Sequence, residues 1–462
     1  MTAVPTPLHG GDPHSDSLVL VETARPLMDA YRLARNTLPG ARHPALMQAR
    51  DRAMARFAQA GLPTRRDEAW KYTDLKRLAK LAPLMTAGDQ PPPADLDDTL
   101  AVADESLHAM VFVDGRFRAD LSFLGSLPDG VTVRPVSEVL EEAPDTLAAL
   151  FEGDAAARDG LEWAALALMA DGAFVELAES AELESPLRLV HLFSQRPAPV
   201  LAAPHLSVRA GANSAVTVVE HWAGPAAGDA VILPTQAIAL GDGARVRLYR
   251  HQEGGDGALH LARGDVRVAR DTTFEAFALT TGGGLVRNEM RVAIDGPGVD
   301  VHLGGVYLGN GDRHIDTTTL VQHAAPDGVS RQVFRGVLDD RAHGVFQGRV
   351  GVARDAQRTD GHQLSNALLL SPKAEMDAKP ELEIFADDVK CSHGATTGDI
   401  DHNALFYLRA RGIDEAVARG LLIEAFIGEA MADITDEGVA EAFADAARSW
   451  WHAHTRTHTP AA

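Results

Sequence analysis

Apolar residues in the first third of the chain recur three or four positions apart, which is the spacing of one face of an α-helix. Met54 and Phe57 fit such a face, and the same spacing returns over residues 136–170. One short apolar run, Met110–Val113, indicates instead a strand that leads into a turn. We therefore predict a mainly helical region over residues 18–171.

The pattern changes at Gly172. From there to about residue 400, short runs rich in β-branched residues follow one another, with Gly and Asp between them. A sandwich or barrel seldom runs so long, whereas a solenoid can, because each coil contacts only its neighbours. No strict repeat is legible, so a double-sheet jelly roll stays open as the alternative. We predict a β core over residues 172–400 and favour a solenoid.

The two ends of the chain differ from this core. Residues 1–17 are rich in Pro, Gly, His and Asp, and we predict that they are disordered. Residues 401–462 return to helical spacing and form the predicted C-terminal helical domain. We expect these helices to close the open sheet edge at the end of the β core, since an uncovered edge recruits other chains.

Composition narrows the classes of partner. The net charge of −22 disfavours nucleic acids and anionic membranes, because both bind basic surfaces. No apolar run approaches the ~20 residues that span a bilayer. The single cysteine excludes an intrachain disulfide and no signal peptide is visible, so we predict a cytoplasmic protein.

Several enzyme motifs are absent from the sequence. It contains no GxxxxGK[ST], no GxGxxG, no CxxC and no GxSxG. The chain by itself therefore lacks a P-loop for ATP, a dinucleotide fingerprint, a four-thiolate cluster site and a hydrolase nucleophile elbow.

The single cysteine, Cys391, stands two residues before His393 in a run of alternating apolar and polar residues. Side chains alternate faces along a strand, so both point the same way. A thiolate and an imidazole on one face can serve as two metal ligands or as a nucleophile and a base. A lone cysteine is more often a small buried hydrophobe, and that interpretation stays open.

Two other classes of function remain possible from the residues alone. Paired acids at Asp339-Asp340 and Asp387-Asp388 could act on a sugar in a β-helix carbohydrate-active enzyme, although such pairs are more often turns. A stand-alone, histidine-rich, metal-binding β protein is the other alternative. Its candidate ligands are the histidines of the second half: His302, His314, His323, His343 and His362.

The stretch Gln363–Thr396, which contains Cys391 and His393, closely resembles the SufB/SufD family of scaffold subunits in SUF iron–sulfur cluster assembly. The resemblance continues through Leu405–Ile413 and Leu421–Phe426. At the other end of the chain, Arg66–Leu75 is more similar to the SufD branch than to SufB. These motifs cover about a quarter of the chain and lie in the family's order.

The resemblance implies a mainly β protein with flanking helices: a right-handed parallel β-helix core between N- and C-terminal helical regions. It implies a non-catalytic scaffold that pairs with SufB through the β-helix cores and binds the ATPase SufC through the C-terminal helices. Cys391 and His393 match the family's Cys-x-His positions near the SufB–SufD interface, and His393 is the favoured contributor to the cluster site. The corresponding SufC-binding positions are Leu421, Leu422, Glu424 and Phe426.

The resemblance also implies a transient iron–sulfur cluster shared with SufB, with no cofactor on the isolated chain. A flavin in the complex and a homodimer of the isolated chain are both compatible with it. Because iron accepts thiolate and imidazole, a partial Cys/His ligand set divided between two chains suits a scaffold that must release its cluster.

Overall fold

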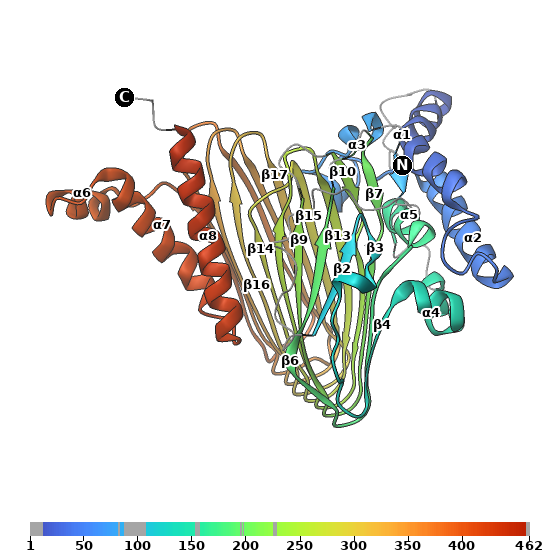
Figure 1. Cartoon of the computed structure of the whole chain (residues 1–462). Helices are drawn as coiled ribbons and strands as arrows, with labels where there is room; N and C mark the ends of the chain where they lie inside the picture. The colour runs from blue at the N-terminus through green and yellow to red at the C-terminus, as the bar shows by residue number, and fades with distance from the viewer. Residues whose placement is uncertain are drawn as a thin grey trace, which may run out of the picture.

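The computed structural model describes residues 13–81, 84–86, 108–152, 158–194, 196, 198–224 and 229–458. Two long sheets face each other and wind as one β-helix, with helices at its N-terminal end and along one side (Figure 1). Strands from β13 onward alternate between the two sheets, so each coil contributes one strand to each wall. The predicted mainly β fold with a solenoid core and flanking helices is confirmed, and the jelly-roll alternative is wrong.

The two sheets are built almost entirely from parallel pairs; the antiparallel ones are β2–β3 and β4–β5 at the start. The main path of the twelve-stranded sheet comprises β4 (Val131–Pro135), β5 (Gly172–Leu177), β8 (His205–Ala210), β11 (Thr235–Leu240), β13 (Leu259–Val268), β15 (Leu285–Ile294), β17 (His314–His323), β19 (His343–Val352) and β21 (Glu375–Ile384). The short strands β1 (Met85–Thr86), β7 (Val200–Ala202) and β10 (Ala230–Ile232) join it from the side.

The ten-stranded sheet forms the opposite wall. Its strands are β3 (Arg116–Phe117), β2 (Ala109–Val113), β6 (Glu182–Leu192), β9 (Ala215–Ala223), β12 (Arg245–Glu253), β14 (Thr273–Thr280), β16 (Asp300–Gly309), β18 (Val329–Leu338), β20 (Asp360–Leu369) and β22 (Lys390–Gly398). The strand expected at residues 110–113 is therefore present as β2. The region over residues 18–171 is helical and also contributes strands that begin both sheets.

One corner of the coil recurs with the same backbone shape. A residue with positive φ stands there in successive coils, at Ser180, Asn213, Gly243, Asp271, Gly298, Asp327 and Arg358. The corner N–H commonly donates to a carbonyl of the next coil, as from Asn213 to Asp242 at 2.8 Å. Asn, Asp and Gly adopt this left-handed conformation most easily. At Gly243 a Cβ would lie 2.3 Å from Asn213 Oδ1, so a larger residue there would force the Asn213 side chain to move.

The interior between the sheets is apolar for most of its length and includes Val218, Leu248, Phe274 and Leu303. Burial of this column is the main stabilising term for such a fold, because each coil buries apolar surface against the next.

A second core lies under the N-terminal helices. These are α1 (Pro13–Ala34), α2 (Pro44–Ala60), α3 (Lys76–Lys80), α4 (Val136–Glu142) and α5 (Gly160–Leu168), with 3₁₀ turns η1 (Glu68–Trp70), η3 (Ala119–Leu121) and η4 (Pro144–Phe151). Leu27, Phe57 and Trp163 are buried there. The buried guanidinium of Arg50 donates to the carbonyls of Ala167 and Met169 at 2.8 and 2.7 Å, which ties α2 to the end of α5. Residues 1–12 lie outside the described residues, while residues 13–17 begin α1.

The C-terminal helices are α6 (His402–Ala410), α7 (Glu415–Met431) and α8 (Glu437–His458). They do not close the end of the β-helix as expected. Instead α7 and α8 pack on the outer face of the ten-stranded sheet, against Tyr249, Phe277 and Val306. This outer face carries apolar side chains, and the two helices remove them from water.

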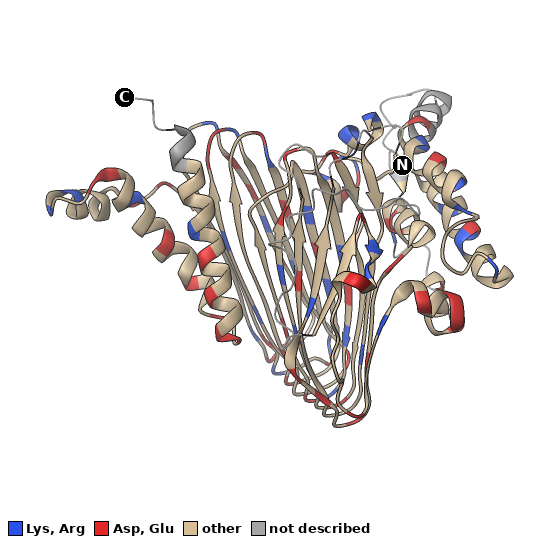
Figure 2. Ribbon diagram, in the orientation of Figure 1, with Lys and Arg blue, Asp and Glu red and all other residues tan. Residues whose placement is uncertain are grey.

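Charge is spread over the molecule. Lys and Arg are interspersed with Asp and Glu along the strands and helices (Figure 2). No described helix is long and apolar enough to cross a membrane.

Candidate functional site

Cys391 and His393 lie on β22, the last strand of the ten-stranded sheet. In the register with β20, Cys391 stands opposite Gly361 and His393 opposite Gln363. Gln363 is buried in the interior, so both residues of the pair face the interior side of the sheet, as their spacing predicted. Among the described residues β22 pairs with β20 alone and β21 with β19 alone, so both sheets end here in an unpaired edge.

The two side chains differ in their surroundings. Cys391 is half-buried and packs on a small cluster of Val350, Val352, Ala356 and Ala386, whereas His393 is exposed. Burial raises the pKa of the Cys391 thiol. The thiol is therefore protonated at neutral pH, and it becomes a good ligand only when a metal displaces the proton.

Behind this pair the interior becomes polar. Gln332 and Gln363 follow one another in the row that ends at His393. Thr319 Oγ1 donates to Gln332 Oε1 at 2.7 Å, while the buried Gln332 Nε2, Gln363 Oε1 and Ser365 Oγ have no hydrogen-bond partner. Buried polar atoms are usually satisfied. The open end thus offers donors and acceptors, as well as a thiol and an imidazole, to whatever binds there.

Apolar side chains border the same open end. Ile384, the last residue of the edge strand β21, is 38% exposed, and Phe385, which follows it, is 68% exposed. Exposed apolar groups beside an unpaired edge are typical of a surface that another chain covers.

The N-terminal SufD-like segment reaches this end across the outer face of the twelve-stranded sheet. The ring of Trp70 lies 4.2 Å from the guanidinium of Arg287 on β15, and Thr73 donates to Asp316 on β17. Gln347 on β19 donates to the carbonyl of Ala69 at 3.1 Å. Glu68 pairs with Lys379 on β21. The segment therefore connects four successive coils up to the last one.

The four residues expected to bind SufC lie on α7 but do not share one environment. Leu421 is 46% exposed, and Glu424 pairs with Arg448 of α8 at 2.8 Å. Leu422 and Phe426 are partly buried against the core, and Phe426 also stacks under Arg335 at 4.6 Å. Leu421 and Glu424 line a groove between α7 and α8.

Sequence reasoning missed the most exposed apolar residues of this region. Phe406 and Tyr407 on α6 are 74% and 56% exposed, and Val417 at the start of α7 is 55% exposed. The sequence could have identified Phe406 and Tyr407. Both lie in the motif Leu405–Ile413, and two adjacent aromatic residues break the amphipathic pattern of a short helix.

The histidines proposed for a metal-binding protein have local partners instead. His302 lies 3.0 Å from Asp300, His343 lies 2.8 Å from Asp377, and His323 lies 2.9 Å from the hydroxyl of Ser330. None of the five belongs to a group of three potential ligands among the described residues.

The acid pairs occupy turns, which was their simpler interpretation. Asp340 has positive φ at a corner, and Asp339 accepts from His454 at 2.8 Å. Asp387 and Asp388 lie in the bend between β21 and β22. This placement does not favour a carbohydrate-active enzyme.

The site and fold together describe a parallel β-helix with one end open and helices along its side. Comparison with known proteins identifies the family to which this β-helix belongs. A family model described as "SUF system FeS cluster assembly, SufBD core domain" matches residues 193–426, and one described as "SufBD protein N-terminal region" matches residues 21–189. The chain belongs to the SufBD family of iron–sulfur cluster assembly proteins.

Individual relatives agree with this assignment. The chain is 30% identical to the iron–sulfur cluster assembly protein SufD of Escherichia coli, over 84% of this chain and 89% of that protein. It is 29% identical to a SufBD family protein of Synechocystis, over 86% and 89% of the two chains. A chloroplastic protein of Arabidopsis thaliana, ABCI7, is also 29% identical, over 83% and 82%. The predicted resemblance is confirmed.

Proposed function

We propose that this chain is a non-catalytic scaffold subunit of a cytoplasmic SUF complex. It pairs with a SufB-like subunit through the open end of the β-helix and binds the ATPase SufC through its C-terminal helices. The observation that carries the proposal is the pair Cys391 and His393 on an unpaired edge strand.

The chemistry of this pair suits a shared and temporary cluster. A thiol and an imidazole are too few ligands to hold a cluster, so the partner subunit has to complete the set. The high pKa of the Cys391 thiol favours release, because protonation competes with the metal for the sulfur. His393, which is exposed, is the first ligand that an incoming cluster meets.

The edge strands give the partner a means of docking. An unpaired edge presents backbone N–H and C=O groups that a strand of another chain can extend. Ile384 and Phe385 supply apolar contact beside these hydrogen bonds. The proposal therefore puts cluster chemistry at a subunit boundary.

The C-terminal helices supply a separate surface for SufC. Phe406, Tyr407, Val417 and Leu421 expose apolar area on α6 and α7, and aromatic residues of this kind dominate binding energy at interfaces. ATP binding at SufC then moves the two β-helices relative to each other and opens the cluster site, as a rigid-body switch.

The experiment replaces His393 by Ala in the reconstituted complex. We expect cluster yield, measured by visible absorption and iron content, to fall by at least about tenfold. Loss of a residue that only orients a metal ligand typically lowers metal affinity or activity about 10- to 100-fold, and loss of the ligand itself should cost more. Co-purification of the three subunits is expected to remain unchanged.

The matched control is His362→Ala. His362 is a partly buried histidine on the neighbouring strand β20, where it pairs with Asp360 at 2.8 Å on the outer side and also contacts the hydroxyl of Ser392 on β22. Cluster yield in this control should equal that of the unmodified complex. A full yield in His393→Ala would refute the direct role of His393.

A further inference from the structure

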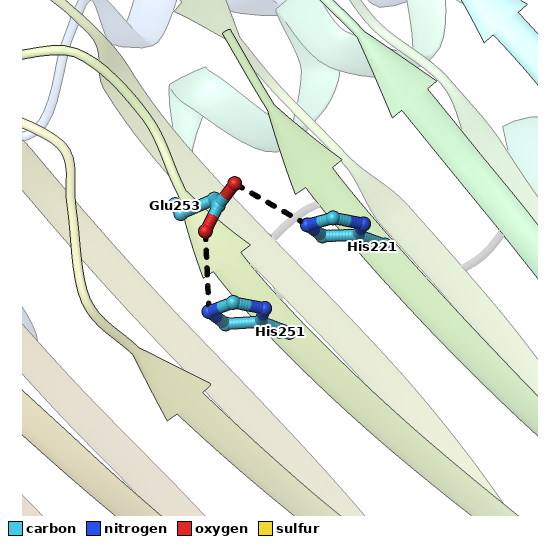
Figure 3. Close-up of side chains that lie close together, drawn as sticks. All are labelled: His221, His251 and Glu253. Carbon is cyan, nitrogen blue, oxygen red and sulfur yellow. Dashed lines mark ion pairs between the residues drawn. The ribbon is translucent and has the colours of Figure 1, made fainter. Parts of the chain in front are cut away.

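Three potential metal ligands meet on the outer face of the ten-stranded sheet, away from Cys391 and His393. His221 lies on β9, and His251 and Glu253 lie on β12 (Figure 3). The register places His221 directly opposite His251 in the adjacent coil, and Ala223 opposite Glu253. Parallel pairing therefore stacks the two imidazole rings, whose planes differ by 3° with centroids 5.1 Å apart.

The ligand atoms point at one another. His221 Nε2 lies 3.6 Å from Glu253 Oε1, and His251 Nε2 lies 3.7 Å from Glu253 Oε2. All three ligand atoms lie within 4.8 Å of one another. Around a tetrahedral Zn²⁺ with bonds of ~2.0–2.2 Å, ligand atoms stand about 3.4 Å apart. The two nitrogen–oxygen distances lie close to this value. The two parallel rings have to tilt towards each other before both Nε2 lone pairs can reach one ion.

The surroundings of His221, His251 and Glu253 are compatible with a bound metal ion. His221 Nε2 is buried and has no hydrogen-bond partner. His251 Nε2 is 3.1 Å from the hydroxyl of Thr281, and metal binding would replace this hydrogen bond. Phe443 of α8 lies 6.0 Å from the His251 ring and shields one side. Glu253 remains 49% exposed, which provides the path for entry.

We propose that His221, His251 and Glu253 bind one divalent first-row transition-metal ion, with a coordination position left to water. Two imidazoles and a carboxylate suit Zn²⁺ and Fe²⁺, and the general order of affinities predicts tighter binding of Zn²⁺ than of Fe²⁺. Mg²⁺ and Ca²⁺ prefer oxygen ligands and are not expected to compete. The ion joins two adjacent coils beside α8, independently of cluster assembly at the open end.

The test is a Zn²⁺ titration of the full chain after treatment with a chelator, followed by calorimetry or by competition with a coloured chelator. We expect one ion per chain. Loss of a group that only orients a ligand costs about 10- to 100-fold in affinity, so Glu253→Gln should weaken binding by at least about 100-fold.

Three further variants make the result specific. His302→Ala changes an exposed histidine on the same face, which pairs with Asp300, and should bind Zn²⁺ normally. The double variant Cys391→Ser, His393→Ala should also bind normally, because its site is at the open end. His221→Asn provides a second change within the proposed site and should lose binding as Glu253→Gln does.

Metal-free stability separates binding from folding. The urea midpoint in the presence of chelator should be the same in all variants, while Zn²⁺ should raise the midpoint of the unmodified chain by mass action. Unaltered affinity in both Glu253→Gln and His221→Asn, or loss of binding in the double variant at the open end, would overturn the proposal.

Discussion

The two ends of the β-helix have opposite surfaces. At the N-terminal end, five helices and two antiparallel strand pairs cover the first coils, and residues such as Phe57 and Trp163 are fully buried. At the other end, β21 and β22 are largely exposed, and Phe385 projects into solvent. A solenoid exposes an edge of each sheet wherever it stops, and monomeric proteins cover such edges. The proposed docking of a partner subunit at the open end rests on this difference.

The interior does not follow this difference. Arg250 pairs with Glu220 at 2.8 Å and Gln236 donates to the same carboxylate at 2.9 Å in the middle coils, and Gln332, Gln363 and Ser365 continue the buried polar side chains towards the open end. The two ends therefore differ in what covers their sheets.

The largest effect on the free energy of unfolding should come from low pH, because it protonates buried histidines away from the open end when the chain unfolds. Burial lowers the pKa of His191 to about 3 and of His205, His314 and His323 to about 4, and it holds the pKa of His260 well below its usual range. In the unfolded chain these groups take up protons near pH 6.5, whereas in the folded chain they do not. The free energy of unfolding should therefore fall as pH decreases from about 6.5 towards 4, by up to about 1.4 kcal/mol per pH unit for each histidine.

Urea unfolding at several pH values measures this slope. His260→Gln removes one such histidine, whose ring nitrogens have no hydrogen-bond partner, and should make the dependence shallower. A free energy of unfolding that is flat between pH 6.5 and pH 5 would contradict the prediction, because five buried neutral histidines would then have no effect.

A pair of identical substitutions compares the two ends directly. Phe57→Ala removes a fully buried ring at the covered end and should cost about 3–5 kcal/mol of stability. Phe385→Ala removes a ring that is 68% exposed and should change the stability of the isolated chain by about 0.5 kcal/mol or less. Chemical denaturation of both variants measures the difference.

In a binding assay, Phe385→Ala should have the larger effect of the two variants. Phe385→Ala is expected to weaken capture of the SufB-like subunit, whereas any folded fraction of Phe57→Ala should bind as the unmodified chain does. Equal stability losses at the two ends would show that the open end is part of the cooperative core.

The smallest effect concerns the helices along the side. Leu421→Asp places a charge in the exposed part of the α7–α8 groove and should weaken SufC capture by about 2 kcal/mol, roughly 30-fold, with little change in stability. Leu33→Asp, at a leucine that is 77% exposed on α1, is the matched control. Equal SufC affinity in the two variants would move the docking surface away from α7.

Much of the architecture could be predicted from the sequence. The change of pattern at Gly172 coincides with the first residue of β5, and β22 ends at Gly398, close to the predicted boundary at residue 400. The repeat was not legible because it is carried by backbone shape. Ser180, Gly243 and Arg358 share a corner conformation but no side-chain chemistry.

The position of the C-terminal helices could not be predicted for a related reason. Tyr249, Phe277 and Val306 lie on the outside of the sheet, and alternation alone does not tell which apolar face is the interior. The Cys391–His393 pair was found because both residues lie on one strand. His221 and His251 were missed because they become neighbours only when the coil register is known.

The recurring left-handed corner has a consequence for the dimensions of the molecule. Each coil of the core contacts the next through the same corner geometry and the same parallel pairing. The strand pairing within a coil therefore does not depend on the number of coils before it. Adding or removing one whole coil would shift the two ends by about 4.8 Å, the spacing of neighbouring strands. It would also break the contacts that span several coils, which are those of residues 68–73 and of α7 and α8. The length of this β-helix is therefore fixed by the segments that lie along its outside.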